Sequence, residues 1–403
     1  MPLAARAPPG SESRACGETA PLGGLRPLSY LLGTMRPAAG KIVIAAAYCV
    51  AVALFLEGAA RAVLSSDALF RRVAGNDEAS WRLRWVKRQK TGRRIYYAFD
   101  DYHPTRGWAL RPNLRDVPAF GGKTLSSNSR GLRGAREYSL VKPAGFSRIV
   151  VLGDSFTFGE DVGDDETWPR RLEELMPGTE VLNLGVHGYG HDQMLLYLRE
   201  EGLKYRPDVV VVGFLPDDME RNVVAFRDYA KPRFVLRGGQ LALRNVPVPS
   251  PDDVLAREPY RLKFLDLLSM LRGDLLRRSG REQEAMREIT LPLLDEMSSA
   301  ITAAGARAAF AYLPVYGEID KADPGMTGRE HFFFSYWRQH GIQSMYLRPY
   351  FLEKLRRGAE FKTYGHWGAL EHQTVAEGVK AYLVEKGLIV NANAPRPPSP
   401  PKS

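Results

Sequence analysis

Between residues 147 and 351 the chain alternates continuous apolar runs with segments of helical spacing. Buried strands are predicted at "SRIVVLGDS", "EVLNLGVHGYG", "RPDVVVVGFLPDD", "ARAAFAYLPV" and "GIQSMYLRPYF". Helices are predicted at "HDQMLLYLREEGLKY" and "EQEAMREITLPLLDEMSSAITAAG". Val-, Ile- and Leu-rich strands that alternate with helices are typical of a parallel sheet covered on both faces. The pattern therefore predicts a doubly wound α/β domain.

Less regular stretches before, between and after these runs make up the other segments of the chain. Residues 65–145 are turn-rich and predict a lead-in segment that packs on the main domain, 146–390. An insert at 226–281 carries "RFVLRGGQLALRNVPVP", two alternating runs around a Gly-Gly pair, which predict a β-hairpin. The insert either shapes access to the site or is a surface decoration. The Pro-rich tail 391–403 is expected to be disordered.

The run "IVIAAAYCVAVALFL", residues 42–56, is apolar throughout and slightly longer than the run of a typical core helix. It is shorter than the ~18 residues that identify a transmembrane helix outright. With Arg36 and Lys41 before it, it is typical of a signal peptide or signal anchor at 41–64, after a disordered leader 1–40. A core helix is the alternative.

These features predict a membrane-anchored or exported protein on the periplasmic side of a bacterial membrane. The small-x-small pattern Ala60-Arg61-Ala62 offers a cleavage site. The basic stretch Arg82 to Arg94 argues against export, because cations just after a span are disfavoured on the translocated side.

Composition narrows the function classes. The 403 residues are 44% hydrophobic and 25% charged, as in globular proteins, with a net charge of +10. No zinc-finger spacing or aromatic-basic RNA signature accompanies that charge, so no nucleic-acid partner is expected. The two cysteines, Cys16 and Cys49, precede the main domain, so it has no thiolate nucleophile and no Cys-based metal site. The acidic stretch 160–166 is interpreted as a solvated turn, and neither a metal nor a cofactor is predicted.

The candidate chemistry follows the strands. Ligands of doubly wound sheets bind beyond the carboxyl ends of the strands, where Gly153-Asp154-Ser155, the glycines of "GVHGYG" and Asp217-Asp218 fall. Late in the chain, "YGHWGALEH" supplies His366 and His372. A hydroxyl nucleophile needs a base within hydrogen-bond reach and donors for the oxyanion. Each motif alone is weak.

Together and in order, these blocks resemble the GDSL, or SGNH, hydrolase family, and "NSRGLRG" in the lead-in segment is similar to its membrane-anchored bacterial members. The matching stretches are "VVLGDSFTFGE", "NLGVHGYG", "GFLPDDMERN" and "YGHWGALEH". The resemblance implies a flavodoxin-like three-layer α/β/α sandwich and an esterase or acylhydrolase. It implies that Ser155 is the nucleophile and His366 its base, and that the N–H groups of Ser155 and Gly188 donate to the oxyanion, with Asp154 and Asp218 as supporting residues.

Two positions depart from the family pattern. Asp217 stands where the family has an oxyanion-hole Asn, and an ionised carboxylate cannot donate a hydrogen bond. It helps there only if protonated; alternatively it turns away to bond backbone N–H groups or pairs with Arg221. Tyr364, with Thr363 before it, stands where the family has the triad Asp.

The orienting acid has several possible replacements. They are Glu371, Glu360 or an acid of the insert, and a Ser–His dyad without an acid is the other possibility.

The predicted reaction is hydrolysis of an ester, namely of an O-acyl group such as acetyl on a carbohydrate. The expected partners are an acylated small molecule or polysaccharide and a membrane. If a sugar hydroxyl replaces water, the same site is an acyltransferase. The alternative of another class is a catalytically weak member of the fold that binds glycans or partners.

Overall fold

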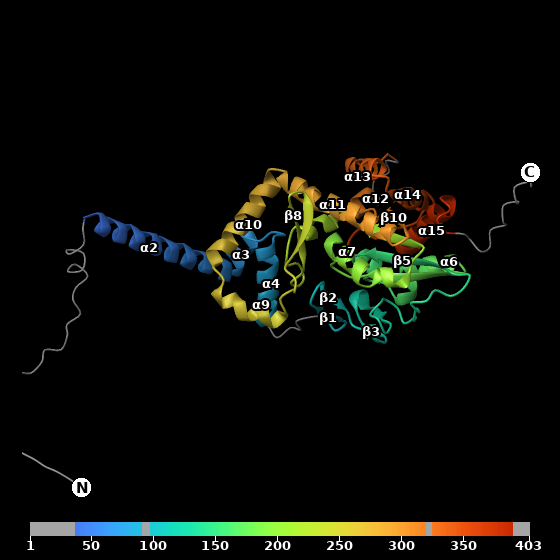
Figure 1. Cartoon of the computed structure of the whole chain (residues 1–403), viewed down its shortest axis with the longest axis horizontal. Helices are drawn as coiled ribbons and strands as arrows, with labels where there is room; N and C mark the ends of the chain where they lie inside the picture. The colour runs from blue at the N-terminus through green and yellow to red at the C-terminus, as the bar shows by residue number, and fades with distance from the viewer. Residues whose placement is uncertain (1–36, 91–96, 320–324, 390–403) are drawn as a thin grey trace, which may run out of the picture. The chain divides into compact units, whose positions relative to one another are not determined.

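The structure is a computed structural model that describes residues 37–90, 97–319 and 325–389 (Figure 1). The predicted leader, apart from its last four residues, and the predicted tail lie outside the described residues. The chain divides into two units, Met1–Ala59 and Ala60–Ser403, and each is described by itself.

Helix α2, Pro37–Ser65, contains the predicted signal or anchor segment. Its stretch Gly40–Ser65 is 26 residues long with a hydropathy of 2.2, and by length and composition it is able to cross a membrane. The most apolar 18 residues of that stretch are not buried inside the protein: Ile42, Tyr48 and Phe55 are exposed, and burial begins only near the end of the helix, at Ala60 and Leu64. The exposure disagrees with the core-helix alternative and is consistent with a signal sequence or anchor.

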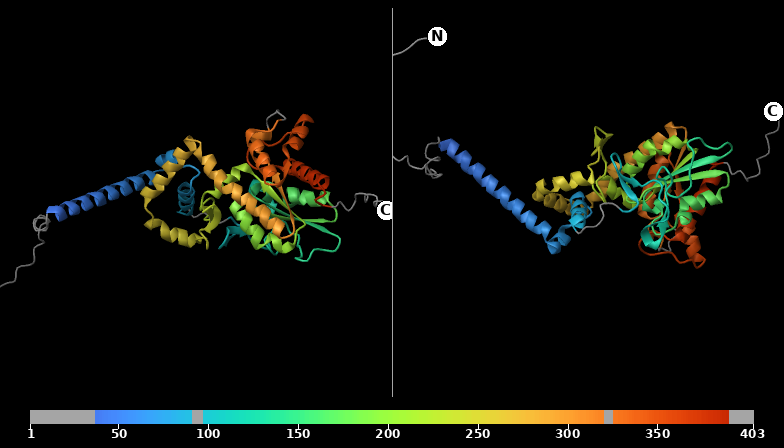
Figure 2. Two further views of the ribbon diagram at one scale, coloured as in Figure 1. Left: turned by 45° about the horizontal axis from the view of Figure 1, so that its top comes forward. Right: turned by 90° about the horizontal axis from the view of Figure 1, so that it is seen from below.

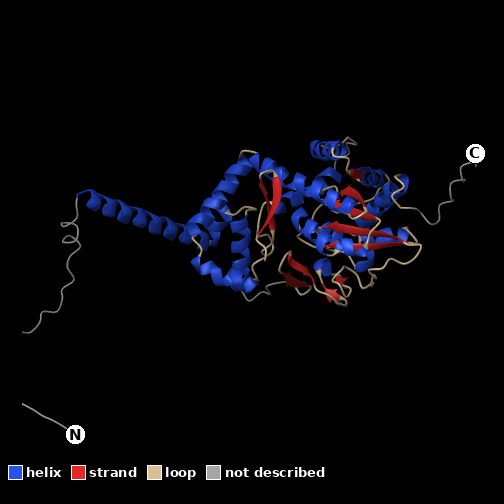
Figure 3. Cartoon of the chain, in the orientation of Figure 1, coloured by secondary structure: helices blue, strands red, loops and turns tan. Residues whose placement is uncertain are grey.

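Five parallel strands form the central sheet of the second unit (Figure 3). They are β5 (Ser147–Gly153), β6 (Thr179–Gly185), β7 (Val209–Phe214), β10 (Arg307–Tyr312) and β11 (Gln343–Tyr346). Their order is β11-β10-β7-β5-β6. Read from the β6 edge and numbered along the chain, the order is second, first, third, fourth, fifth, which is the flavodoxin-like order. The predicted α/β sandwich is confirmed.

Helices cover both faces of this sheet (Figure 2). Successive residues of a strand point to opposite faces, so in β5 Val150 and Leu152 belong to one buried cluster, and Ile149 and Val151 to the other. The first cluster includes α7 (His191–Glu200), α11 (Arg281–Ala303) and α13 (Gly328–Gln339). The second includes α6 (Trp168–Leu175), α14 (Arg348–Arg356) and α15 (Ala369–Glu385).

The predicted fifth strand is shorter than its apolar run. It ends at Tyr346, and helix α14 starts at Arg348 with a proline in its first turn. Proline fixes a backbone angle that suits the first turn of a helix and lacks the N–H that a strand needs.

The remaining elements belong to the lead-in segment, the connections and the insert. The helices are α3 (Asp67–Val73), α4 (Glu78–Lys90), α5 (Ser155–Phe158), α8 (Met219–Asn222), α9 (Pro251–Arg257), α10 (Lys263–Arg278) and α12 (Tyr316–Ile319). The strands pair as antiparallel hairpins: β1 (Asp100–His103) with β2 (Gly107–Leu110), β3 (Val117–Pro118) with β4 (Thr124–Leu125), and β8 (Arg233–Arg237) with β9 (Gln240–Arg244). The β8–β9 hairpin of the insert confirms the prediction.

The lead-in segment and the insert are joined by a buried ion cluster. Arg82 of α4 donates to Glu258 at 3.0 Å and to Asp266 of α10 at 2.5 Å. One cation of the basic stretch that begins at Arg82 is therefore paired inside the fold rather than exposed beside a membrane.

Candidate active site

Ser155 lies on the turn that follows strand β5, between β7 and the edge strand β6. Asp154 caps helix α5 by accepting a hydrogen bond from the N–H of Phe156 at 3.0 Å. Gly153 is required before the turn, because a Cβ there would lie 2.0 Å from Oγ1 of Thr157. The turn holds Ser155 at the carboxyl end of the sheet, where ligands bind in doubly wound folds.

His366 lies within hydrogen-bond reach of Ser155. Its Nε2 is 2.9 Å from Oγ of Ser155, across 211 positions of sequence. The loop that carries it is held by Glu371, whose carboxylate accepts hydrogen bonds from the N–H of Lys362 at 2.6 Å and of Gly368 at 3.0 Å. Burial lowers the pKa of His366 below its ordinary value. A neutral imidazole is therefore available to accept the hydroxyl proton.

Glu160 stands where an orienting carboxylate is needed. Its Oε2 is 3.1 Å from Nδ1 of His366, on the ring nitrogen that does not face Ser155. A carboxylate there holds the proton on Nδ1 and leaves the Nε2 lone pair for the hydroxyl. The predicted solvated turn is wrong at Glu160, which is only 9% exposed. The three side chains form a Ser–His–Glu arrangement.

A second histidine lies behind Glu160. Nδ1 of His187 is 3.9 Å from Oε1 of Glu160, and its Nε2 is 2.8 Å from Oδ2 of Asp100. Tyr229 donates to the same Asp100 carboxylate at 3.1 Å. Burial opposes charge on His187, but the Asp100 carboxylate outweighs it and raises the pKa of His187 to about 9.

The positive charge of His187 affects the pKa of Glu160. Burial raises the pKa of Glu160 to about 7, and the His187 cation opposes that rise. His187 therefore favours the ionised form of Glu160, which is the form that orients His366. This role could not be predicted from the sequence, where His187 is only one residue of the glycine block "GVHGYG".

Gly188 lies in the loop after β6, next to the Ser155 turn. Gly185, at the end of β6, pairs with Gly153, at the end of β5, so the two loops leave the sheet side by side. Gly188 has a φ of +73°, and a Cβ there would lie 2.8 Å from Oδ2 of Asp228. The positive φ disfavours a residue with a side chain there. The arrangement is compatible with oxyanion donors from Ser155 and Gly188.

An arginine links the two buried acids of the site. Nη1 of Arg221 is 2.6 Å from Oδ1 of Asp218 and 3.5 Å from Oδ2 of Asp154. Oγ of Ser155 donates to the same Asp154 oxygen at 3.2 Å. Burial raises the pKa of Asp218 well above that of an ordinary carboxyl. Asp154 and Asp218 thus share a buried cluster beside the nucleophile, with Arg221 as their counter-charge.

The structure does not bring Asp217 into this cluster. Its side chain is 62% exposed and its Oδ1 is 2.8 Å from Nη1 of Arg329. Asp217 and Asp218 are consecutive residues of a single helical turn that begins at Pro216, so they point in different directions, and Asp218 is the one that faces inward. The predicted oxyanion role of Asp217 is therefore corrected, as is its alternative pairing with Arg221.

Asp217→Asn is accordingly expected to leave the pH profile of ester hydrolysis unchanged. An exposed ion pair such as Asp217–Arg329 contributes about 0–1 kcal/mol to stability, so the unfolding temperature should change little. The check is kcat/KM of both proteins from acidic to neutral pH. A clear gain of activity in Asp217→Asn at neutral pH would return Asp217 to the oxyanion site.

Other candidates take structural places. Tyr364 is 83% exposed and so does not support His366. His372 is buried, and its Nδ1 accepts a hydrogen bond from the N–H of Trp168 at 3.1 Å. Burial lowers the pKa of His372 to about 3. Glu371 caps α15, and Glu360 is exposed. Glu371 and Glu360 were both candidates for the orienting acid, and neither of them lies beside His366.

The fold and the site together define a class: a flavodoxin-like α/β domain with a Ser–His–carboxylate arrangement at the carboxyl edge of its sheet. No family model matches the chain, and no curated protein matches it. The fold is similar to a GDSL-like lipase from Bacteroides thetaiotaomicron, at 15% identity over 61% of this chain and 92% of that one, with a TM-score of 0.35.

A second similar structure is a catalytic mutant of an acetylxylan esterase from Geobacillus stearothermophilus. It is 14% identical over 61% of this chain and 97% of that one, with a TM-score of 0.35.

Proposed function

We propose that the protein is a serine esterase or acylhydrolase of the GDSL/SGNH type. Ser155 is the nucleophile, His366 the base and Glu160 the carboxylate that orients it. The observation that carries the proposal is the 2.9 Å contact of Ser155 Oγ with His366 Nε2, with Glu160 3.1 Å from the other ring nitrogen. The order of the four sequence blocks supports it. The catalytically weak alternative rested partly on a missing acid, and Glu160 removes that reason.

The reaction takes two half-reactions. Oγ of Ser155 attacks the acyl carbon while its proton moves to Nε2 of His366, and the N–H groups of Ser155 and Gly188 stabilise the oxyanion. The carbon–oxygen bond to the leaving alcohol then breaks, and the imidazolium of His366 gives the alcohol its proton. Water, deprotonated by His366, attacks the acyl-enzyme and releases the carboxylic acid and the free serine.

The substrate class and the location belong to the same proposal. We infer an O-acyl group, such as acetyl, on a carbohydrate, because several members of the family that the sequence blocks resemble act on acetylated polysaccharides. The apolar stretch Gly40–Ser65 supports a membrane anchor or export signal, with the catalytic unit on the periplasmic side.

A fluorophosphonate probe tests the function directly, because only an activated serine reacts with it. The full-length protein is expected to be labelled at Ser155, and Ser155→Ala should remain unlabelled. Hydrolysis of a short-chain aryl acetate by the same preparations gives the matching activity. A folded wild-type protein that neither labels nor hydrolyses would favour the binding protein over the enzyme.

Replacing His187 by glutamine is expected to shift the acid limb of the activity profile to higher pH. Glu160 must be ionised to orient His366, so activity falls as the pH drops through its pKa of about 7, which the His187 cation holds down. Without that cation the pKa of Glu160 rises further. The check is kcat/KM against pH, with His340→Gln, which removes a surface contact to Asp295, as the matched control. An unmoved acid limb would contradict this role.

A further inference from the structure

Helix α10 of the insert exposes an apolar row to solvent. Leu265, Leu268, Leu271 and Leu275 are 54%, 52%, 50% and 67% exposed. Their spacings of three and four residues place them on one side of the helix, which we call the leucine face. Scattered exposed leucines are ordinary, but soluble proteins rarely leave a contiguous apolar row of this kind in water.

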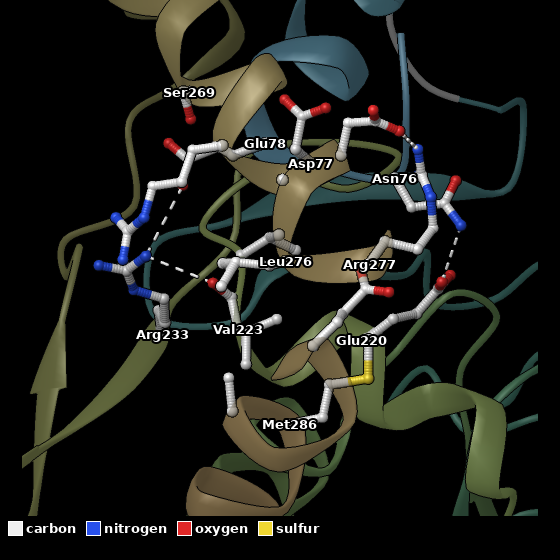
Figure 4. A pocket seen from close by; sticks show the side chains of 16 residues that line it. Asn76, Asp77, Glu78, Glu220, Val223, Arg233, Ser269, Leu276, Arg277 and Met286 are labelled. Carbon is white, nitrogen blue, oxygen red and sulfur yellow. Dashed lines mark hydrogen bonds and ion pairs between the residues drawn. The ribbon is translucent and has the colours of Figure 1, made fainter. Parts of the chain in front are cut away.

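The other sides of α10 are already used inside the protein. Met270 is buried in a cluster with Leu64 and Phe70, and Asp266 pairs with buried Arg82. Another side, with Ser269 and Leu276 among its residues, lines a pocket of about 350 Å³ together with parts of α8 and α11 (Figure 4). The leucine face is what remains of the helix surface.

Within the second unit, α10 lies against the last turns of the apolar helix. Nη2 of Arg61 donates to O of Arg261 at 3.4 Å, just before α10 begins. Leu64, in the last turn of α2, shares its buried cluster with Met270 of α10. The apolar run itself ends at Leu56, only five residues before Arg61. An anchor formed by this run would therefore be joined to the residues that contact α10 by only a few residues of chain.

The charge around the leucine face favours an anionic surface. Residues 257–281 contain seven Lys and Arg against three Asp and Glu. Arg261, Arg272 and Arg278 are exposed among them. A helix with an apolar side flanked by cations is typical of segments that lie in the plane of a membrane interface, where long cationic side chains reach the headgroups.

We propose that the leucine face of α10 lies on the bilayer that holds α2, with its leucines in the interface and its cations against anionic lipid headgroups. The proposal rests on the proposed membrane anchor and is independent of the enzymatic activity. It makes the insert a second, non-covalent contact of the catalytic unit with the membrane.

The test uses site-directed spin labels on single cysteines, so the two native cysteines, Cys16 and Cys49, are replaced unless one of them carries the label. Full-length protein with Cys16→Ser and Cys49→Ser carries a nitroxide label on a single cysteine at Leu268, Leu271 or Leu275. Labels at Arg277, on the pocket side of α10, and at Leu370, an exposed leucine of α15, are the matched controls. A label on native Cys49, within α2, reports the anchor itself. The protein is reconstituted in vesicles of phosphatidylglycerol and phosphatidylcholine, and collision with oxygen is compared with collision with a water-soluble nickel chelate.

Labels at Leu268, Leu271 and Leu275 are expected to lose accessibility to the nickel chelate and gain accessibility to oxygen, whereas those at Arg277 and Leu370 stay accessible to the chelate. In pure phosphatidylcholine the contact of α10 should weaken while that of Cys49 persists. Leucine-face labels as accessible to the chelate as Leu370, with Cys49 in lipid, would overturn the proposal.

Two other outcomes would contradict the proposal and point to a different explanation. Protection of the leucine face in detergent, with spin–spin broadening between protomers, would overturn the proposal in favour of a second copy of the chain. A Cys49 label that lies outside lipid would show that α2 does not hold the protein in the bilayer. It would overturn the proposal for α10 and leave the esterase proposal intact.

Discussion

Alanine at position 155 is expected to lower kcat for a short-chain aryl acetate by about 10⁶, the loss seen when a serine hydrolase loses its nucleophile. Without Oγ no acyl-enzyme forms, and what remains is catalysis by binding and by oxyanion donors alone. The measurement is steady-state hydrolysis together with fluorophosphonate labelling. Full activity in Ser155→Ala would dismiss the nucleophile assignment.

The same variant must be shown to fold. Oγ of Ser155 makes two contacts, with His366 at 2.9 Å and with Asp154 at 3.2 Å, and a lost hydrogen bond costs about 1 kcal/mol. The unfolding temperature should therefore change by a few degrees at most. His366→Ala should lose nearly as much activity, and the double variant should be no worse than either single one, because the two residues act as a unit.

The sheet and Ser155 could be predicted because their signals are local. Each strand is a continuous apolar run, and a buried parallel strand needs no partner in the sequence to be recognised. Ser155 follows such a run directly. His366 was predicted from the order of the family's blocks, and the structure brings its Nε2 to Ser155.

Glu160 was missed because its burial is not a local property. In the sequence it opens a run of acids and glycines that has the composition of a surface turn. In the structure the lead-in segment packs on that turn: a Cβ on Gly121 would lie 2.9 Å from Cα of Asp161. His187 closes the other side. A residue buried by segments distant in sequence cannot be told from a solvated one by composition.

Asp217 and Asp218 also show that burial cannot be predicted from the sequence, here for two consecutive residues. Both follow β7, and the family's block assigns the oxyanion position to the first of them. Which one faces inward is fixed by the helical turn that begins at Pro216 and by Arg221, which pairs with Asp218. The leucine face of α10 is a further case, since an amphipathic pattern alone does not tell which side of a helix the rest of the fold covers.

Replacing Glu160 by glutamine tests the orienting acid. In serine proteases the loss of that carboxylate lowers kcat by about 10⁴, which corresponds to about 5 kcal/mol of barrier. A loss of that order is expected here, because an amide can neither stabilise the imidazolium that forms on His366 nor hold its Nδ1 proton as a carboxylate does, at the 3.1 Å that separates Oε2 from that nitrogen. Glu160→Asp, which keeps the charge one methylene further back, should recover part of the loss.

The control for charge is Glu166→Gln, in the same acidic stretch. Glu166 accepts a hydrogen bond from the N–H of Gly163 at 2.7 Å and pairs with Lys123 at 3.0 Å, away from His366. Removing its charge should leave kcat within a few-fold of wild type and cost a little stability. If Glu160→Gln also stayed within tenfold of wild type, the site would work as a Ser155–His366 dyad, and the buried chain from Glu160 through His187 to Asp100 would be a structural feature of the lead-in segment. A loss near 10⁴ in Glu160→Gln with Glu166→Gln unaffected would instead make Glu160 the third member of the triad.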